Sequence, residues 1–269
     1  MNLELTIGWL YPDLMSTYGD RGNISVLQKR CLWRDIDITI TPIDFSTTNQ
    51  ELRTMNLLFG GGAQDRQQRI LIDDLRKNKG PVLKTMIEKG IPGLFVCGSP
   101  QLLGHWYMTG DGKKLEGLGI FDMVSKHFGT DKPRCIGNLV AEIPNTKYQI
   151  PDTHNTVVGF ENHGGRTYVG KGVEPFARIK RGFGNNGEDG TEGAVYKNCI
   201  ATYSHGPFLP KNPHIADWLI RKALEMKYHK DIPLAPLDDT LEWQAHEYCT
   251  NRFSQKKEVR YESKRYISL

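Results

Sequence analysis

The feature that most constrains the fold is an alternation of apolar runs and amphipathic segments over the first part of the chain. Strand-like runs occur at 3–10 (LELTIGWL), 36–43 (IDITITPI), 55–59 (MNLLF) and 91–96 (IPGLFV). Helix-like segments follow them, after residue 23, from about 63 to 77, from 81 to 89 and from 98 to about 106. Strands that alternate with helices build a parallel sheet covered on both faces. We therefore predict an α/β fold with a mostly parallel central sheet flanked by helices.

The second half of the chain has a different sequence pattern. After Leu115, short strand-like segments are separated by Gly, Pro and Asn, which predicts an antiparallel edge of the same domain. The last part is predicted helical: Asn212 and Pro213 resemble a helix start, and an apolar stripe at helical spacing follows, made of Ile215, Trp218, Leu219, Ala223 and Met226. We expect one domain over 1–235, followed by a C-terminal helical segment and basic tail over 236–269.

Charge and hydropathy exclude several classes of function. The chain contains no long uncharged apolar run, and its start, MNLELTIGWL, has no basic segment before the apolar one, so we expect a cytoplasmic protein. The net charge is +4, and residues 251–269 alone carry six Lys or Arg and two Glu, which also gives +4. The rest of the chain is therefore neutral, which argues against nucleic-acid binding. The tail is expected to be solvated or weakly attracted to an anionic surface.

Cysteine and histidine spacing argues against metal chemistry and disulfides. The five cysteines are widely spaced and form no CxxC, and the eight histidines form no HxxxH. This pattern fits neither a disulfide framework nor a zinc site, so we expect no metal and no cofactor.

Cys97 is the candidate nucleophile. It follows the apolar run at 91–96 directly, at the expected carboxyl end of a parallel strand, where ligands bind in such sheets. A tight turn from strand to helix would lift the thiol clear of the sheet and set helix N–H groups beside it, which favours the thiolate. Gly98 would permit the close backbone approach that this turn needs. A buried structural cysteine is the alternative interpretation.

Two further patterns favour the nucleophile over the structural cysteine. The stretch FGGG at 59–62 is a second strand end whose N–H groups could stabilise an oxyanion together with that of Gly98, although a plain tight turn has the same sequence. His205, followed by Gly-Pro, lies at a third strand end and could act as the base. His163, in FENHGGRTY, is the rival base, and we prefer His205.

Taken together, these stretches resemble the class I glutamine amidotransferases, in the branch related to cobyric acid synthase. The resemblance covers about residues 1–230 in order. It rests on YGDRGN (18–23), LFGGGAQDRQQ (58–68), GLFVCGSPQLLG (93–104), LEGLGIFD (115–122), VGFENHGGRTY (158–168), GFGNNGEDGTEGAVYKN (182–198) and TYSHGPFLPKN (202–212).

The resemblance implies a covalent mechanism. Cys97 would attack the side-chain amide of glutamine, and His205 would take the thiol proton and pass it to the leaving ammonia. Water would then release glutamate from the thioester. The oxyanion would be held by backbone N–H groups of the residues predicted to contact substrate, Gly61, Gly62 and Gly98.

The resemblance also assigns a substrate contact to Arg134, in DKPRCIGN. A guanidinium suits a bidentate grip on the α-carboxylate of glutamine, and a surface ion pair is the alternative role. Ser99-Pro100 departs from the pattern, because the close subfamily usually has Gly-Gly after the cysteine. Ser99 is expected to tighten the turn, Pro100 suits the first turn of a helix, and the shape of the glutamine pocket could differ.

Within the branch, the stretches are most similar to glutaminase subunits of lipid II isoglutaminyl synthases. This implies a heterodimer in which ammonia passes to a Mur-ligase-like, ATP-dependent subunit that amidates the D-glutamate α-carboxyl of lipid II to D-isoglutamine during peptidoglycan synthesis. The complex would work at the inner face of the membrane without insertion. The chain has no Walker A loop, in keeping with ATP chemistry on the partner. Alternatives are another acceptor such as a corrinoid carboxylate, a catalytically silent ligase-binding subunit, or a stand-alone cysteine peptidase.

One part of the wider pattern is missing next to the histidine. The class uses His-x-Glu, whereas His205 is followed by Gly206 and Pro207. We therefore expect no acid in this chain to orient the imidazole. The expectation that follows is that the partner supplies a carboxylate and that the isolated chain is a slow glutaminase.

Overall fold

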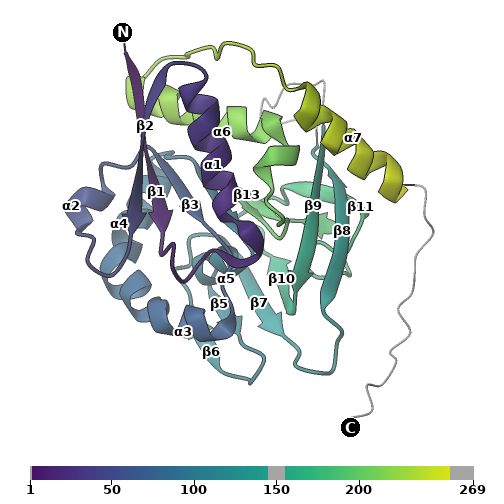
Figure 1. The fold of residues 1–269 in the computed structure, drawn as a ribbon. Helices are drawn as coiled ribbons and strands as arrows, with labels where there is room; N and C mark the ends of the chain where they lie inside the picture. Colours follow the sequence, from purple (N-terminus) through teal and green to yellow (C-terminus); the bar gives the residue numbers. More distant parts are fainter. Residues whose placement is uncertain (1, 145–154, 255–269) are drawn as a thin grey trace.

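A computed structural model describes residues 2–144 and 155–254 and contains three sheets (Figure 1). The central sheet has six strands in the order β13-β14-β4-β3-β1-β2. Their bounds are β1 (Leu3–Leu10), β2 (Ile36–Ile43), β3 (Leu57–Gly60), β4 (Gly93–Val96), β13 (Ala194–Tyr196) and β14 (Cys199–Thr202). All neighbours pair in parallel except β13, which runs antiparallel to β14 at one edge. The predicted α/β class and mostly parallel sheet are confirmed.

Helices cover both faces of this sheet, because successive residues of its short buried strands point to opposite sides. Leu57 and Phe59 join one hydrophobic cluster, while Leu58 between them joins the other. The first cluster lies under α1 (Arg21–Leu32) and α6 (Pro213–Tyr228). The second lies under α3 (Asp65–Asp74), α4 (Gly80–Glu88) and α5 (Gly98–Leu103), with the short α2 (Asn49–Leu52) nearby and a π-helical turn, Leu75–Lys79, between α3 and α4.

The predicted antiparallel edge is present as β13, but most of the middle of the chain forms two additional four-stranded sheets. One has the order β10-β7-β5-β6, from β5 (Trp106–Met108), β6 (Lys114–Glu116), β7 (Met123–His127) and β10 (Gly165–Val169). The other has the order β12-β11-β8-β9, from β8 (Cys135–Glu142), β9 (Thr156–His163), β11 (Ala177–Arg181) and β12 (Thr191–Glu192). The helix expected to reach Trp106 ends at Leu103, because residue 106 already pairs in β5.

The C-terminal helix α7 (Thr240–Ser254) packs against β8 and β9. His246 of this helix contacts the Thr156 hydroxyl at 2.8 Å and the Lys211 carbonyl oxygen at 2.7 Å. Buried Arg30 of α1 forms ion pairs with Asp217 of α6 and with Asp239, just before α7. Residues 255–269 of the expected basic tail lie outside the described residues.

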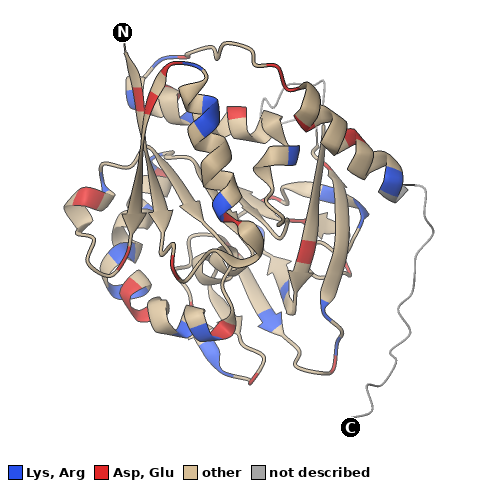
Figure 2. Ribbon diagram, in the orientation of Figure 1, with Lys and Arg blue, Asp and Glu red and all other residues tan. Residues whose placement is uncertain are grey.

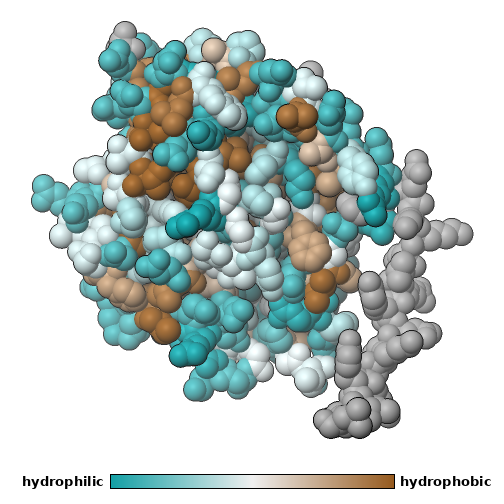
Figure 3. All heavy atoms as spheres, in the orientation of Figure 1, coloured by the Kyte–Doolittle hydropathy of each residue, from teal (hydrophilic) through white to brown (hydrophobic). Residues whose placement is uncertain are grey.

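The described surface is mixed in character. Lys and Arg are interspersed with Asp and Glu along the ribbon (Figure 2), and on the face drawn in Figure 3 the apolar residues form small groups separated by polar ones. Within residues 2–144 and 155–254, no helix combines the length and apolar character that crossing a membrane requires.

Candidate active site

Four adjacent parallel strands end at the same edge of the central sheet, and polar or glycine residues follow each of them. Cys97 comes directly after β4, and the glycine loop Gly60–Gly62 ends β3. His205 lies three residues beyond β14, and the loop that follows β1 leads to Asp20. Because the carboxyl ends of parallel neighbours meet, the fold brings these residues together from distant parts of the sequence.

Cys97 lies at a strained bend between β4 and α5. Its backbone has φ 54° and ψ −95°, a conformation that non-glycine residues rarely adopt. Its N–H donates to the Thr202 carbonyl oxygen at 2.8 Å, so the neighbouring strand holds the bend in place. The side chain is 8% exposed and lines a cavity, which is the geometry of a nucleophile elbow.

Gly98 and Ser99 join this bend to the glycine loop. A Cβ on Gly98 would lie 2.6 Å from the backbone nitrogen of Ala63, so only glycine allows the two loops to pack this closely. The Ser99 hydroxyl donates to the Gly61 carbonyl oxygen at 2.7 Å. Ser99 thus connects the turn to the glycine loop, and Pro100 lies in the first turn of α5.

His205 is fully buried beside Cys97. Its backbone N–H donates to the Phe160 carbonyl oxygen at 2.7 Å, which anchors the residue to β9. Burial alone would lower the pKa of His205, but the charge of the Cys97 thiolate and the hydrogen bond and charge of Asp20 raise it to about 10. Among the described residues, no group makes a hydrogen bond to Nε2 of the ring. Cys97 and Asp20 thus both stabilise the charged imidazolium of His205.

The expectation that no acid of this chain orients the imidazole is wrong. Asp20 is fully buried, and its Oδ1 lies 3.1 Å from Nδ1 of His205. The sequence pattern pointed to a position two residues after the histidine, whereas the acid comes from the loop after β1, 185 residues away. The useful signal was YGDRGN, which follows the first strand and therefore lies at the same sheet edge.

The glycine loop packs on these side chains, but Gly62 does not offer a free donor as predicted. Its N–H donates to Oδ2 of Asp20 at 2.6 Å, so that group is already engaged. A Cβ on Gly62 would lie 2.8 Å from Cε1 of His205, and one on Gly61 would lie 2.3 Å from the Met15 carbonyl oxygen. The roles expected for Gly61 and Gly98 stay predictions.

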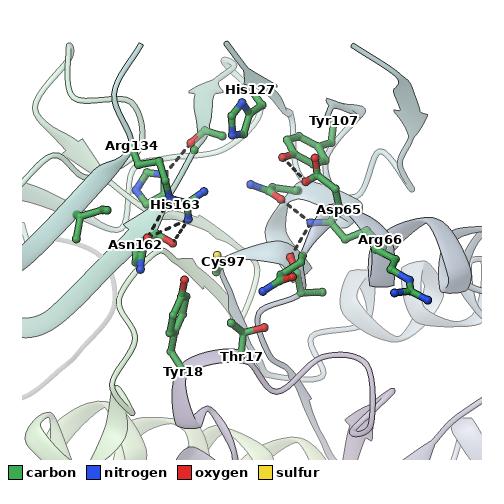
Figure 4. Close-up of a pocket in the computed structure, with 17 residues that line it drawn as sticks. Thr17, Tyr18, Asp65, Arg66, Cys97, Tyr107, His127, Arg134, Asn162 and His163 are labelled. Atoms are coloured by element: carbon green, nitrogen blue, oxygen red, sulfur yellow. Dashed lines mark hydrogen bonds between the residues drawn. The ribbon is translucent and has the colours of Figure 1, made fainter. Parts of the chain in front are cut away.

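The cavity beside Cys97 has a volume of about 500 Å³, within the range of small-molecule sites. Figure 4 shows Cys97 between two walls, with Arg134 and Asn162 on one side and Asp65 and Tyr107 on the other. Nε and Nη2 of Arg134 donate to Asn162 at 2.9–3.1 Å, so Arg134 is held in the cavity wall rather than in a surface ion pair.

The opposite wall carries a carboxylate that the sequence interpretation missed. Asp65 Oδ1 accepts from the Tyr107 hydroxyl at 2.8 Å, and Oδ2 accepts from the Gly110 N–H at 2.8 Å. A carboxylate has about four acceptor positions, so Asp65 keeps capacity for a further donor.

His163, the rival base, also lines the cavity but is held differently. Burial lowers its pKa to about 4, so the ring is neutral. Its Nδ1 donates to the Gly165 carbonyl oxygen at 2.7 Å, and the ring stacks on Tyr203 with centroids 3.8 Å apart. Cys97 raises the pKa of His205, whereas Cys97 is not among the groups that shift the pKa of His163. The geometry therefore favours His205 as the partner of the thiol.

Comparison with known proteins places these features in a family. Residues 6–213 match the CobB/CobQ-like glutamine amidotransferase domain. The chain is 41% identical over 259 residues to the lipid II isoglutaminyl synthase (glutamine-hydrolyzing) subunit GatD of Staphylococcus aureus strain N315, covering 96% of this chain and 99% of that protein. It is 36% identical to the protein of the same name from Streptococcus pneumoniae strain R6, covering 88% and 87%. The glutaminase domain of Trypanosoma brucei CTPS with bound acivicin has a similar fold, with a TM-score of 0.55 at 14% identity, covering 86% and 96%.

Proposed function

The chain belongs to the CobB/CobQ-like glutamine amidotransferase family, and we propose that it hydrolyses L-glutamine to glutamate and ammonia through a thioester on Cys97. The observation that supports this most directly is the Cys97 thiol, held at a strained elbow, open to a cavity and coupled to a buried imidazole. A thiolate nucleophile next to a proton donor is what acyl transfer from an amide requires.

The proposed reaction has two halves. The thiolate of Cys97 attacks the side-chain amide carbon, and the imidazolium of His205 gives its proton to the amine nitrogen, so ammonia leaves and a glutamyl thioester remains. Neutral His205 then takes a proton from water, whose oxygen attacks the thioester carbon and releases glutamate, restoring the thiolate and imidazolium. The oxyanion of each tetrahedral intermediate would lie against the N–H of Gly98, with Gly61 the second candidate donor.

Glutamine is a zwitterion, and the two cavity walls carry matching charges. We place its α-carboxylate on Arg134, whose Nη1 makes no hydrogen bond to the described residues. We place its α-ammonium group toward Asp65 on the opposite wall. The side-chain amide would then reach Cys97, which lies between the walls.

For the fate of the ammonia, we propose the acceptor that the names of the relatives suggest. Both are subunits of lipid II isoglutaminyl synthase, and the similarity to the S. aureus protein spans almost all of both chains. On this proposal the chain is the cytoplasmic glutaminase subunit of a heterodimer, and a Mur-ligase-like partner uses ATP to activate the D-glutamate α-carboxyl of lipid II, which the ammonia converts to D-isoglutamine.

The proposal is tested in two steps. The purified chain, alone and with its co-expressed ligase partner, is incubated with glutamine, and glutamate is measured. Cys97→Ala should abolish hydrolysis, whereas Cys249→Ser, a change in α7, should leave it intact. A diazoketone analogue of glutamine should add covalently to wild type and to Cys249→Ser but not to Cys97→Ala. Absence of both hydrolysis and adduct in wild type would exclude the glutaminase.

The second step follows the nitrogen. With amide-¹⁵N glutamine, ATP, lipid II and the partner, mass spectrometry should find the label in the stem peptide of lipid II. Hydrolysis of glutamine without transfer to lipid II would keep the glutaminase and reject this acceptor.

A further inference from the structure

We propose that Asp20 is the positioning residue of this site, a single buried carboxylate that fixes both the imidazole of His205 and the glycine loop. This inference rests on the proposed glutaminase function and adds a component that the sequence pattern lacked. It also locates the third member of the catalytic group within this chain, in place of a carboxylate from a partner.

The two carboxylate oxygens of Asp20 have different partners. Oδ1 lies 3.1 Å from Nδ1 of His205, and Oδ2 accepts the Gly62 N–H at 2.6 Å. Asp20 and His205 are both completely excluded from solvent. A buried carboxylate is costly unless it is paired and hydrogen-bonded, and here both partners belong to the site.

The contact with His205 decides which form of the ring faces the thiol. Because Oδ1 of Asp20 can only accept, Nδ1 must carry a hydrogen, so in the neutral ring Nε2 presents its lone pair. In the charged ring, the carboxylate stabilises the imidazolium directly. Either way, Asp20 holds the ring in the tautomer and orientation that proton transfer with Cys97 needs.

The segment before Asp20 reinforces the same arrangement. The Thr17 hydroxyl and N–H both donate to the Gly62 carbonyl oxygen, at 2.9 and 3.2 Å. The Tyr18 ring lies edge-on to His205 with centroids 5.1 Å apart, and Tyr18 itself has φ 57°. The loop after β1 therefore packs against the His205 ring as well as against the glycine loop.

A purely structural role for Asp20, as a cap on Gly62, would predict a different outcome from a positioning role. The discriminating variants are Asp20→Asn, Asp20→Glu and Thr17→Val. Thr17→Val removes one hydrogen bond to the same glycine loop and leaves the carboxylate in place, so it controls for loosening of the loop.

The experiment measures kcat, KM and the pH profile of glutamine hydrolysis for each variant, in the isolated chain and in the complex with the partner. For Asp20→Asn we expect kcat to fall by about 10²–10⁴-fold, with KM changed less than about threefold, by comparison with the loss of the acid from a Ser-His-Asp triad. The alkaline limb of the profile, where the imidazolium is lost, should move to lower pH. Asp20→Glu should recover part of kcat. Thr17→Val weakens a contact with the glycine loop and can lower kcat, but it should leave the alkaline limb at its wild-type pH.

Two results would overturn the proposal. One is an Asp20→Asn enzyme with the wild-type kcat and alkaline limb. The other is a loss of activity in Asp20→Asn that comes without a shift of the alkaline limb and that Thr17→Val reproduces. Asp20 would then serve only to cap the glycine loop. The ¹⁵N NMR signals of the His205 ring provide a test without turnover, since Asp20→Asn should lower the pH at which the ring loses its proton. An inactive wild type would count against the glutaminase, while this titration would still decide the role of Asp20.

Discussion

The strained backbone at Cys97 leads to a prediction about stability that is independent of the catalytic assay. A residue with a Cβ at φ 54° and ψ −95° costs about 1–3 kcal/mol relative to glycine. Glycine in turn costs about 0.5–1 kcal/mol through its greater freedom in the unfolded chain. Cys97→Gly should therefore be more stable than Cys97→Ala by roughly 1 kcal/mol, although both variants lack the proposed nucleophile and should be inactive.

A matched pair at an unstrained site gives the opposite sign. Cys31 is fully buried near the end of helix α1, where a change from alanine to glycine should cost up to about 1 kcal/mol. Cys31→Gly should thus be less stable than Cys31→Ala. The contrast between the two pairs removes effects that any loss of a sulfur atom would share.

The measurement is the denaturation midpoint in urea, supported by the melting temperature. For a chain of this size, 1 kcal/mol corresponds to about 2–4 °C. The glycine variant is expected to melt at a lower temperature than the alanine variant at Cys31. If Cys97→Gly also melts at a lower temperature than Cys97→Ala, then Cys97 is not held in a strained conformation and the elbow interpretation is wrong.

Three further outcomes follow from the site and its surroundings. Arg134→Ala should raise KM for glutamine at least tenfold with a smaller effect on kcat, because it removes a contact made equally in the ground and transition states; a fall in kcat alone would contradict this. Asp65→Asn should reduce the preference for glutamine over its analogue without the α-amino group, and an unchanged ratio of kcat/KM values would place the ammonium elsewhere. Burial raises the pKa of Glu192 from 4.5 to about 7. The contribution of the protonated side chain to folding stability is therefore complete below pH 4.5 and is lost as the pH rises through 7. Between pH 4.5 and 8, the free energy of unfolding of Glu192→Gln relative to wild type should rise by on the order of 3 kcal/mol, measured in urea. Stability curves that stay parallel over this pH range would refute the raised pKa of Glu192.

The central sheet could be predicted because its inner strands are buried on both faces, its edge strand β2 alternates, and clear turn signals bound them. The predicted limits of β1 and β2 agree with the structure, and the strand leading to Cys97 ends where expected. Each of these strands carries its own local signal, an apolar run in β1 and β4 and an alternation in β2. The fold class, and the position of Cys97 and His205 at one edge of the sheet, then follow from the parallel order of the strands.

The two smaller sheets could not be predicted in the same way. Their strands are mostly two to five residues long and pair over large separations, as β5 does with β7 and β10 does with β7. A segment such as Trp106–Met108 shows no periodicity of its own, so its pairing depends on tertiary packing. The cavity wall formed by Asp65 and Tyr107 depends on this packing and was missed for the same reason.

The substitution of Gly-Pro for the local acid after His205 is linked to the use of Asp20. Gly206 has φ 95°, a conformation that lets the chain turn sharply after the histidine. Pro207 then packs so closely on the first turn of α1 that a Cβ on Gly22 would lie 2.4 Å from its Cγ. One residue further along α1, the Asn23 side chain accepts the Leu209 N–H at 2.8 Å. These contacts draw the start of α1 against the segment after His205. A glutamate two residues after the histidine would replace Pro207 at this contact. A chain whose acid comes from the start of α1 therefore has a physical reason to lack an acid at that position.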